Sequence, residues 1–424
     1  MLRNKKAVVA IASAAAFALG ISGSGVANAA GATGKIEVFS WWTSGSESAA
    51  LKAILDSLQK ANPKLQIVNA AVAGGAGTNA KQVLATRLAA NNTPETWQTH
   101  PGGELKGYVD QNVLKDQTAL YKSQGWNKVV PKELIDSITF GGKVYSVATG
   151  VHRANVLWYN QKLVKAAGVS LGASTSWAQF SAAAGKIKAT GVAPICLGDK
   201  DIWTAAQLLE EMIVGELGGK AWNDLLSGKL KWSSASVKTV VDHFNTAMTW
   251  TNTDHKALDW TGAVAALAQD KCAMMVMGDW AYGELLVKQG KKDGVDFGYT
   301  VIGDSNTFVT VTDSFVIGKN AKNPKAAEEF LKAVMDPKVQ LAFNKLKGSS
   351  PVRSDVKTAT LGKYQQGAAS VLAKGTKVAS LVHGQANVAA SIGQAYADAV
   401  TVLQANQDAA AFGKTMDDAI ASAK

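Results

Sequence analysis

The sequence predicts an α/β fold in two domains, each built on a mostly parallel sheet flanked by helices. Its length of 424 residues is typical of two domains or one large one. With 47% hydrophobic and 18% charged residues, the chain is able to bury a full core, which disfavours disorder. Strand-like and helix-like patterns alternate near the N-terminus, as expected of a parallel sheet with right-handed crossovers.

This alternation runs from residue 35 to residue 100. In the first helical stretch, Leu51, Ile54 and Leu58 recur on one face, and in the second Val83, Leu84 and Leu88 are expected to point inward. Ligands bind beyond the carboxyl ends of the strands in open α/β sheets, so we expect a site at that edge. The predicted order is a strand at 35–42, a helix at 47–63, a strand at 65–74, a helix at 79–90 and a strand at 95–100.

Later segments continue the α/β pattern. Residues 141–160 are expected to form two β-rich runs meeting at Thr149–Gly150, where the chain would cross between domains. Residues 308–318 are expected to form a strand pair at a second crossover. The remaining expectations are buried strands at 192–199 and 272–283, a helix at 203–217, two helices split at Pro337 within 324–346, and a mostly helical tail over 386–423.

The first 29 residues have the features of a secretory signal peptide. Arg3, Lys5 and Lys6 precede a short apolar run over 7–21, and Ala27-Asn28-Ala29 forms an A-x-A cleavage site. The apolar run is too short to span a bilayer. No cysteine stands near the site, so a lipid-anchored form is not expected. The sequence therefore predicts cleavage after Ala29 and a periplasmic location.

Several classes of function have no support in the sequence. The net charge of +11 is spread along the chain without a run of five basic residues, so we expect no nucleic-acid partner. No phosphate-loop, G-x-S-x-G or H-x-x-x-H motif occurs, so we expect no cofactor, no catalytic residue and no metal. Cys196 and Cys272 lie in apolar strand-like runs, where they form either a disulfide or two buried thiols.

Aromatic residues give the first positive indication. The chain has 12 tryptophans, and several stand at predicted strand ends. A pyranose ring needs a flat aromatic surface against its C–H face and planar polar groups around its hydroxyls. Trp97, Trp177 and Trp222 are expected in the core. His100, His152 and His383 lie in polar-aromatic segments, although a single such histidine is more often structural.

Eight blocks in order carry a resemblance to a known family. They are SWWTSGSES, GGAGTNA, WQTHPGGEL, VHRANVLWYN, MGDWAYG, TDSFVIGKNAKN, FNKLKGSSPVR and SLVHG, from about Lys35 to beyond His383. Together they resemble the glucose/mannose-binding proteins of ABC sugar importers, within the larger family that includes maltose-binding protein.

The resemblance implies a type II periplasmic-binding-protein fold of two lobes joined by hinge crossovers. The implied lobes are residues 30–149 with 310–349, and residues 150–309 with 350–424. It also implies a monomer without enzymatic activity, which captures a monosaccharide (glucose, mannose or galactose) and delivers it to the ABC transporter permease.

The resemblance further implies which residues bind the sugar. Trp41, Trp42 and Trp260 would supply aromatic surface, and Asp279 and Trp280 are secondary candidates that shape the site. The implied polar contacts are Glu47, Gln98, His100, Asn155, Asp313, Lys347 and His383.

Three alternatives remain open at this point. The same fold could bind an oligosaccharide or a polyol in a wider groove. A secreted glycosidase would use Glu47 and Asp313 as its carboxylate pair. A surface interaction protein would bind no small ligand.

Overall fold

The computed structural model describes residues 31–74 and 77–423. The predicted signal peptide lies outside the described residues. Within the described ranges, no helix has the length and apolar character needed to cross a membrane. The described residues from Ala32 onward form one compact unit, which contains a six-stranded, a four-stranded and a two-stranded sheet.

The larger sheet confirms the predicted order of the N-terminal segment. Strand β1 pairs in parallel with both β2 and β3, with α1 and α2 as the connections. Strand β11 then pairs with β3, β12 and β6. The strands are β1 (Gly34–Phe39), β2 (Leu65–Asn69), β3 (Thr96–Thr99), β6 (Ser146–Arg153), β11 (Thr307–Ile317) and β12 (Thr376–Ala379).

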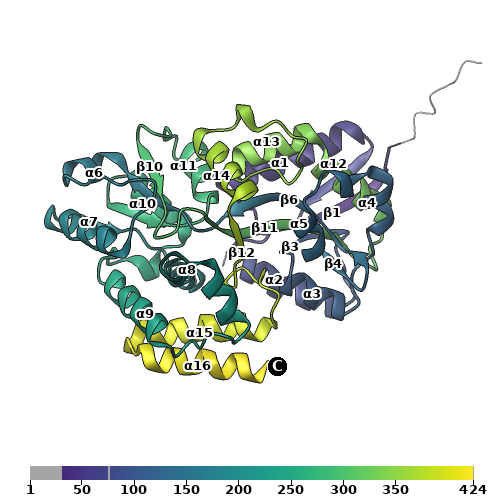
Figure 1. Cartoon of the computed structure of the whole chain (residues 1–424). Helices are drawn as coiled ribbons and strands as arrows, with labels where there is room; N and C mark the ends of the chain where they lie inside the picture. The colour runs from purple at the N-terminus through teal and green to yellow at the C-terminus, as the bar shows by residue number, and fades with distance from the viewer. Residues whose placement is uncertain (1–30, 75–76, 424) are drawn as a thin grey trace, which may run out of the picture. The chain divides into compact units, whose positions relative to one another are not determined.

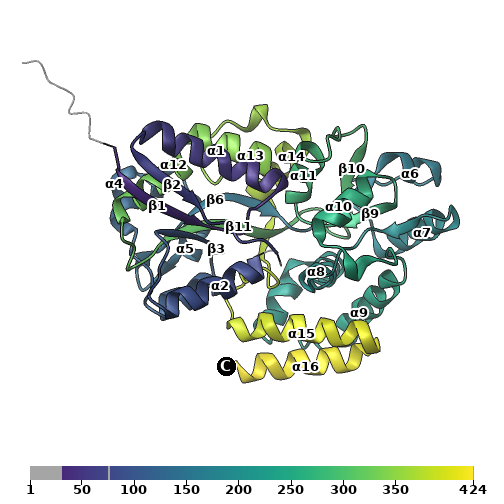
Figure 2. The same cartoon turned by 180° about the vertical axis from the view of Figure 1, so that it is seen from behind.

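Helices cover both sides of this sheet (Figure 1). On one side are α1 (Gly45–Ala61), α12 (Pro324–Met335) and α13 (Pro337–Lys347), which contact one another. On the other side, α2 (Thr78–Ala89) lies below the strands in both views (Figures 1 and 2), and α3 (Gly103–Asp110) lies there in Figure 1.

Burial along α1 and α2 follows the predicted pattern with one exception. Leu51, Ile54 and Leu58 are buried as predicted, and so is Leu84. Val83 was predicted to point inward, but its side chain is 41% exposed. Because an α-helix has about 3.6 residues per turn, two consecutive side chains point in different directions. Leu84 faces the core, so Val83 faces away from it.

The smaller sheet has the strand order β10–β7–β9–β8. A disulfide between Cys196, just after β8, and Cys272, at the start of β9, joins its two parallel strands. The strands are β7 (Leu157–Asn160), β8 (Ala193–Ile195), β9 (Cys272–Val276) and β10 (Phe297–Thr300). Around them lie α6 (Gln161–Ala166), α7 (Trp177–Ala189), α8 (Trp203–Leu226), α9 (Ala235–Met248), α10 (Trp260–Ala268) and α11 (Trp280–Val287).

Two crossover predictions are wrong in detail. No break occurs at Thr149–Gly150, because β6 continues through it and the chain leaves the larger sheet after Arg153. Residues 308–318 form one long strand, β11, rather than a pair. Where the two predicted strands would meet, the pairing of β11 with β6 shifts register between Asp313 and Ser314. Both sheets are mixed, because β11 pairs antiparallel with β3 and β6, and β7 pairs antiparallel with β9 and β10.

The C-terminal segment reaches both sheets. Strand β12 pairs with β11 of the larger sheet, while α15 (Ala390–Asn406) and α16 (Ala409–Ser422) contact α8 and α9, respectively. The fold is therefore α/β with two lobes, although the exact lobe bounds given above remain a prediction. The other elements are α4 (Thr118–Gln124), α5 (Lys132–Ser137), β4 (Thr139–Phe140), β5 (Lys143–Val144) and α14 (Lys363–Lys374).

Candidate functional site

Asp313 lies at the centre of a buried polar cluster between the two sheets. Its Oδ1 accepts a hydrogen bond of 2.8 Å from the side-chain amide of Gln98. Its Oδ2 lies 3.3 Å from His152 Nε2 and 4.0 Å from Lys347 Nζ. Burial alone would raise the pKa of Asp313, but the contact with His152 and the charge of Lys347 hold it well below its usual range. Asp313 is therefore an ionised acceptor.

Lys347 joins this carboxylate to a second one. It is the last residue of α13, and its Nζ lies 2.5 Å from Oε1 of Glu47 in the first turn of α1. The side chain of Lys347 is 3% exposed. Such a buried ammonium group is tolerated because it is paired with carboxylates. Its Nζ also lies 5.3 Å from the centroid of the Trp42 ring.

His100 borders the cluster from the end of β3. Its Nδ1 lies 2.8 Å from Oε2 of Glu104, which also pairs with Lys81 at 2.7 Å. Burial would raise the pKa of Glu104, but Lys81 and His100 hold it well below its usual range. The ionised Glu104 fixes the His100 ring, so that its Nε2 lies 3.7 Å from Asp313 Oδ1.

Aromatic rings form a continuous series beside these charges. The ring centroids of Trp41 and His100 are 5.2 Å apart, and His383 lies 6.0 Å beyond. His383 is in turn 5.3 Å from Trp280 and 5.6 Å from Trp203. Trp203 was missed in the sequence analysis. Its position at the start of a helix gave no signal different from that of a core residue.

Gly77 makes room for the first of these rings. Its φ of +103° favours glycine, and a Cβ at this position would lie 2.9 Å from the Trp41 ring. The half-buried Trp41 is held further by a hydrogen bond of 3.2 Å from its backbone N–H to the Gln98 side chain. Gly77 and Gln98 together thus define the position of Trp41.

A buried carboxylate holds the turn that carries His383. Oε2 of Glu210, in α8, accepts the backbone N–H groups of Leu381 and Val382 at 2.9 and 3.0 Å. Nδ1 of His383 lies 3.0 Å from the Ser380 hydroxyl. Burial and nearby positive charges hold the pKa of His383 far below its usual range, so the ring is neutral.

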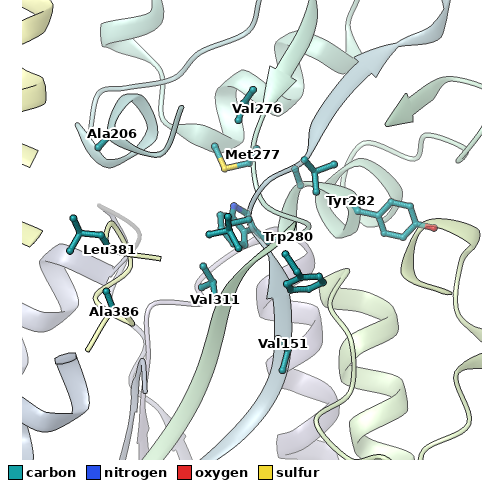
Figure 3. Packing of buried hydrophobic residues seen from close by; sticks show 14 of the residues in the cluster. Val151, Ala206, Val276, Met277, Trp280, Tyr282, Val311, Leu381 and Ala386 are labelled. Atoms are coloured by element: carbon teal, nitrogen blue, oxygen red, sulfur yellow. The ribbon is translucent and has the colours of Figure 1, made fainter. Parts of the chain in front are cut away.

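His152 and Asp279 complete the cluster. Nδ1 of His152 contacts Oδ1 of Asp279, and Trp280 packs edge-on against the His152 ring at 5.5 Å. Figure 3 shows Trp280 in the middle of this part of the core, with Val311 of β11 and Met277 after β9 also drawn. His152 stands in one of the polar-aromatic segments noted above, but the sequence gave it no role in the site.

Three residues predicted to bind sugar have other surroundings. Trp42 is fully buried, with its ring 5.7 Å from that of Phe315 and 5.3 Å from that of Phe343. Asn155 accepts the N–H of Val309 and donates to the carbonyl of Thr307, so its amide holds the crossover backbone.

Trp260 is the third of these residues. It begins α10 and is partly buried against the core. Within residues 31–74 and 77–423, no hydrogen bond or aromatic contact joins Trp260 to the cluster around Asp313.

The cluster is suited to binding rather than to chemistry at a metal. Trp41, His383 and Trp280 present flat surfaces, while Asp313 and Glu47 accept and Lys347 donates hydrogen bonds. Charged partners make such hydrogen bonds roughly twice as strong as neutral ones. In the part of the chain that the structure describes, no group of three or more His, Cys, Asp or Glu residues is placed to hold a metal ion.

Comparison with known proteins agrees with this architecture. Two relatives match most of the chain. An uncharacterized ABC transporter extracellular-binding protein of Pyrococcus horikoshii is 32% identical over 83% of this chain and 80% of its own length. A probable sugar-binding periplasmic protein of Brucella melitensis is 31% identical over 86% of this chain and 87% of its own.

Among solved structures, a chitin oligosaccharide binding protein superimposes with a TM-score of 0.79 at 18% identity, covering 92% of this chain and 99% of the other. At that identity the likeness concerns the fold alone. The family model of the bacterial extracellular solute-binding proteins matches residues 42–341. The chain belongs to the family of bacterial extracellular solute-binding proteins.

Proposed function

We propose that this protein is the sugar-binding component of an ABC importer and that it binds one monosaccharide at the cluster around Asp313. The observation that carries the proposal is the meeting of aromatic rings with the ionised Asp313 and the Glu47–Lys347 pair. The rings match the apolar faces of a pyranose, and the charges match its hydroxyls. The names of the relatives from Pyrococcus horikoshii and Brucella melitensis support the same assignment.

Burial of the cluster favours a single sugar ring over a chain of rings. The side chains of Asp313, Lys347 and His100 are 6%, 3% and 5% exposed. A hydroxyl that left one of these groups unpaired would cost about 1–3 kcal/mol, which gives selectivity among epimers. We assign glucose, mannose or galactose as the ligand on this basis, together with the resemblance.

Binding then requires the lobes to move. The cluster residues come from elements of both sheets and contact one another, so sugar enters only when the sheets separate. The bound sugar favours closure by its greater affinity for the closed form. The permease would recognise the closed surface in the periplasm, after export by the signal peptide. Under this proposal the protein acts as a monomer and carries out no chemical step.

Isothermal titration tests the proposal directly. Glucose, galactose, mannose and xylose are titrated in turn, with maltotriose and a chitin trisaccharide in parallel. We expect heat and 1:1 binding with at least one hexose. Absence of heat with every monosaccharide would overturn the proposal. Binding of a trisaccharide alone would favour the alternative of an oligosaccharide ligand, to which the fold of the chitin oligosaccharide binding protein is also suited.

The glycosidase alternative conflicts with the state of Asp313. Glycoside hydrolysis needs one carboxylic acid that stays protonated, with a raised pKa. The pKa of Asp313 is instead held below its usual range by His152 and Lys347 against the opposing effect of burial. Glu47 pairs with the Lys347 ammonium group at 2.5 Å, so neither carboxyl is placed as the protonated acid. We therefore expect no release of nitrophenol from aryl glucosides under conditions in which a hexose binds.

A further inference from the structure

His152 lies between two carboxylates that come from different parts of the fold. The ring belongs to β6, and its side chain is 1% exposed. Nδ1 contacts Oδ1 of Asp279, in the loop between β9 and α11. Nε2 lies 3.3 Å from Oδ2 of Asp313, in β11, which is an ion-pair distance without the geometry of a hydrogen bond. The imidazole thus connects the crossover strands of the larger sheet to a loop of the smaller sheet.

The placement of both ring nitrogens near carboxylates favours the charged ring, while burial also raises the pKa of Asp279. A neutral imidazole carries one N–H and one lone pair. Either neutral tautomer of His152 would direct its lone pair at a carboxylate oxygen, of Asp279 in one tautomer and of Asp313 in the other. Both nitrogens donate only in the imidazolium. Burial lowers the pKa of His152, but Asp279 and Asp313 outweigh burial and leave the pKa above its usual value.

The two carboxylates are held at their other oxygens as well. Oδ2 of Asp279 accepts the backbone N–H of Arg153 at 2.9 Å and lies 3.5 Å from the Tyr364 hydroxyl. Oδ1 of Asp313 accepts the amide of Gln98 at 2.8 Å. The hydrogen bond from Gln98 at Oδ1 and the ion pair with His152 at Oδ2 therefore act on both oxygens of Asp313.

Other charged groups around the ring also affect the pKa of His152. The positive charge of Lys347, in α13, lowers the pKa of His152. Its Nζ lies 4.0 Å from Oδ2 of Asp313. His100 at the end of β3 faces Asp313 at 3.7 Å, and Glu47 of α1 pairs with Lys347. The remaining charged group is Arg153, next to His152 in β6, whose guanidinium turns away to the carbonyls of Ser305 and Thr307.

We propose that His152 is a positioning residue, whose imidazolium is held by Asp279 and orients the Asp313 carboxylate towards the bound sugar. This role rests on the proposed function and adds a residue that contacts Asp313 rather than the sugar. Loss of the ring charge would remove the ion pair with Asp313 and leave Oδ1 of Asp279 without its partner, while Oδ2 of Asp279 keeps the N–H of Arg153.

Three variants test the role. His152→Gln keeps a planar polar group without the charge, and Asp279→Asn keeps the ring but removes the carboxylate that holds its proton. We expect each to weaken hexose binding about 10- to 100-fold in titration calorimetry. The matched control is His255→Gln. His255 also pairs with an aspartate, because its Nδ1 lies 2.5 Å from Oδ1 of Asp199, but this pair lies outside the cluster. We expect the Kd of the His255→Gln variant for hexose to stay within about twofold of the parent value.

The pH profile separates positioning from a merely structural role. A raised pKa in the folded protein means that the imidazolium is fully present below the usual pKa of 6.5 and is lost as pH rises through the higher folded value. We therefore expect hexose affinity to fall as pH rises through the pKa of His152 in the folded protein. Asp279→Asn lowers the pKa of the ring, so the fall should move to lower pH. A residue that only fills space would leave the profile in place.

The ring itself is observed by 15N–13C NMR of histidine, which needs no ligand. We expect both nitrogens of His152 to be predominantly protonated at pH 6.5 in the parent, because its pKa is raised above that value. A neutral ring there, or His152→Gln and Asp279→Asn proteins with parental affinity, would overturn the proposal. If the parent binds no hexose, the proposed function fails, and the NMR spectrum still decides the state of His152. If His152→Gln does not fold, Asp279→Asn decides the role.

Discussion

Glu210 is a fully buried carboxyl group that accepts two backbone N–H groups of the His383 turn. Its burial disfavours the charged form. Burial raises its pKa to about 7, although the N–H groups of Leu381 and Val382 act in the opposite direction. Because this is above its usual value of 4.5, the folded state holds the proton more tightly. The free energy of unfolding therefore decreases as pH rises from 4.5 to 7 and stays lower above that window.

Glu210→Gln should remove this pH dependence. Glutamine keeps an oxygen for the two N–H groups, but its new amide N–H₂ replaces an oxygen that has no partner and costs stability equally at all pH values. Relative to the parent, the variant should gain up to about 3 kcal/mol between pH 4.5 and pH 8. Denaturant unfolding at both pH values measures the gain. An equal difference at both would contradict the assigned pKa.

The sequence located much of the cluster but not its supporting residues. Asp313, Lys347, His100 and Trp41 stand in separate motifs, and the structure brings them together, while their role in sugar binding stays a prediction. His152 contacts a carboxylate 127 residues away, and Glu210 contacts a turn 171 residues away. No local pattern encodes contacts over such separations. Within the described residues, Trp260 makes no hydrogen bond or aromatic contact with the cluster, which only a fold could reveal.

At the scale of elements, the disulfide joins two short strands that share few other constraints. Cys196 and Cys272 are 76 residues apart in sequence; Cys196 lies just after β8, and Cys272 begins the neighbouring strand β9. A cross-link over this separation restricts the unfolded chain by about 4 kcal/mol in the chain-entropy model. The smaller sheet has four short strands, so we expect this restriction to matter for its stability.

Replacing both cysteines with alanine should lower the free energy of unfolding by about 2–5 kcal/mol. Guanidinium unfolding monitored by tryptophan fluorescence measures the difference. The parent protein unfolded with a thiol reductant serves as the matched control, and it should approach the variant. A reduced parent that is as stable as the oxidised one would contradict the expected contribution of the cross-link.

The elements themselves could be predicted where periodicity was strong, as in α1, α12 and α13. The crossover strands could not, because Gly150 resembles a strand end. The structure shows a different reason for this glycine. A Cβ at residue 150 would lie 2.1 Å from Oδ1 of the buried Asn344 in α13. Glycine here permits close helix–strand packing within a continuous strand, which a single sequence does not distinguish from a turn.

At the scale of the whole molecule, the path of the chain defines how the lobes can move. The chain passes from the larger sheet to the smaller one between β6 and β7 and returns between β10 and β11. Both connections lie close to the cluster, since β6 carries His152 and β11 carries Asp313. We propose these connections as the hinge. A hinge so close to the ligand converts a small rotation into opening of the cluster.

Ligand-dependent closure should be visible in solution. Because a cluster this buried admits sugar only from an open form, the free protein should populate that form, and the bound sugar should shift it to the closed one by differential affinity. We expect the radius of gyration from small-angle X-ray scattering to decrease at saturating hexose and to stay constant with a sugar that gives no heat. At 100 times Kd, the stability of the protein should also rise by about 2.7 kcal/mol. If the protein binds hexose with this stabilisation but its radius of gyration does not change, then sugar enters without lobe motion. In that case the buried charges belong to a preformed pocket.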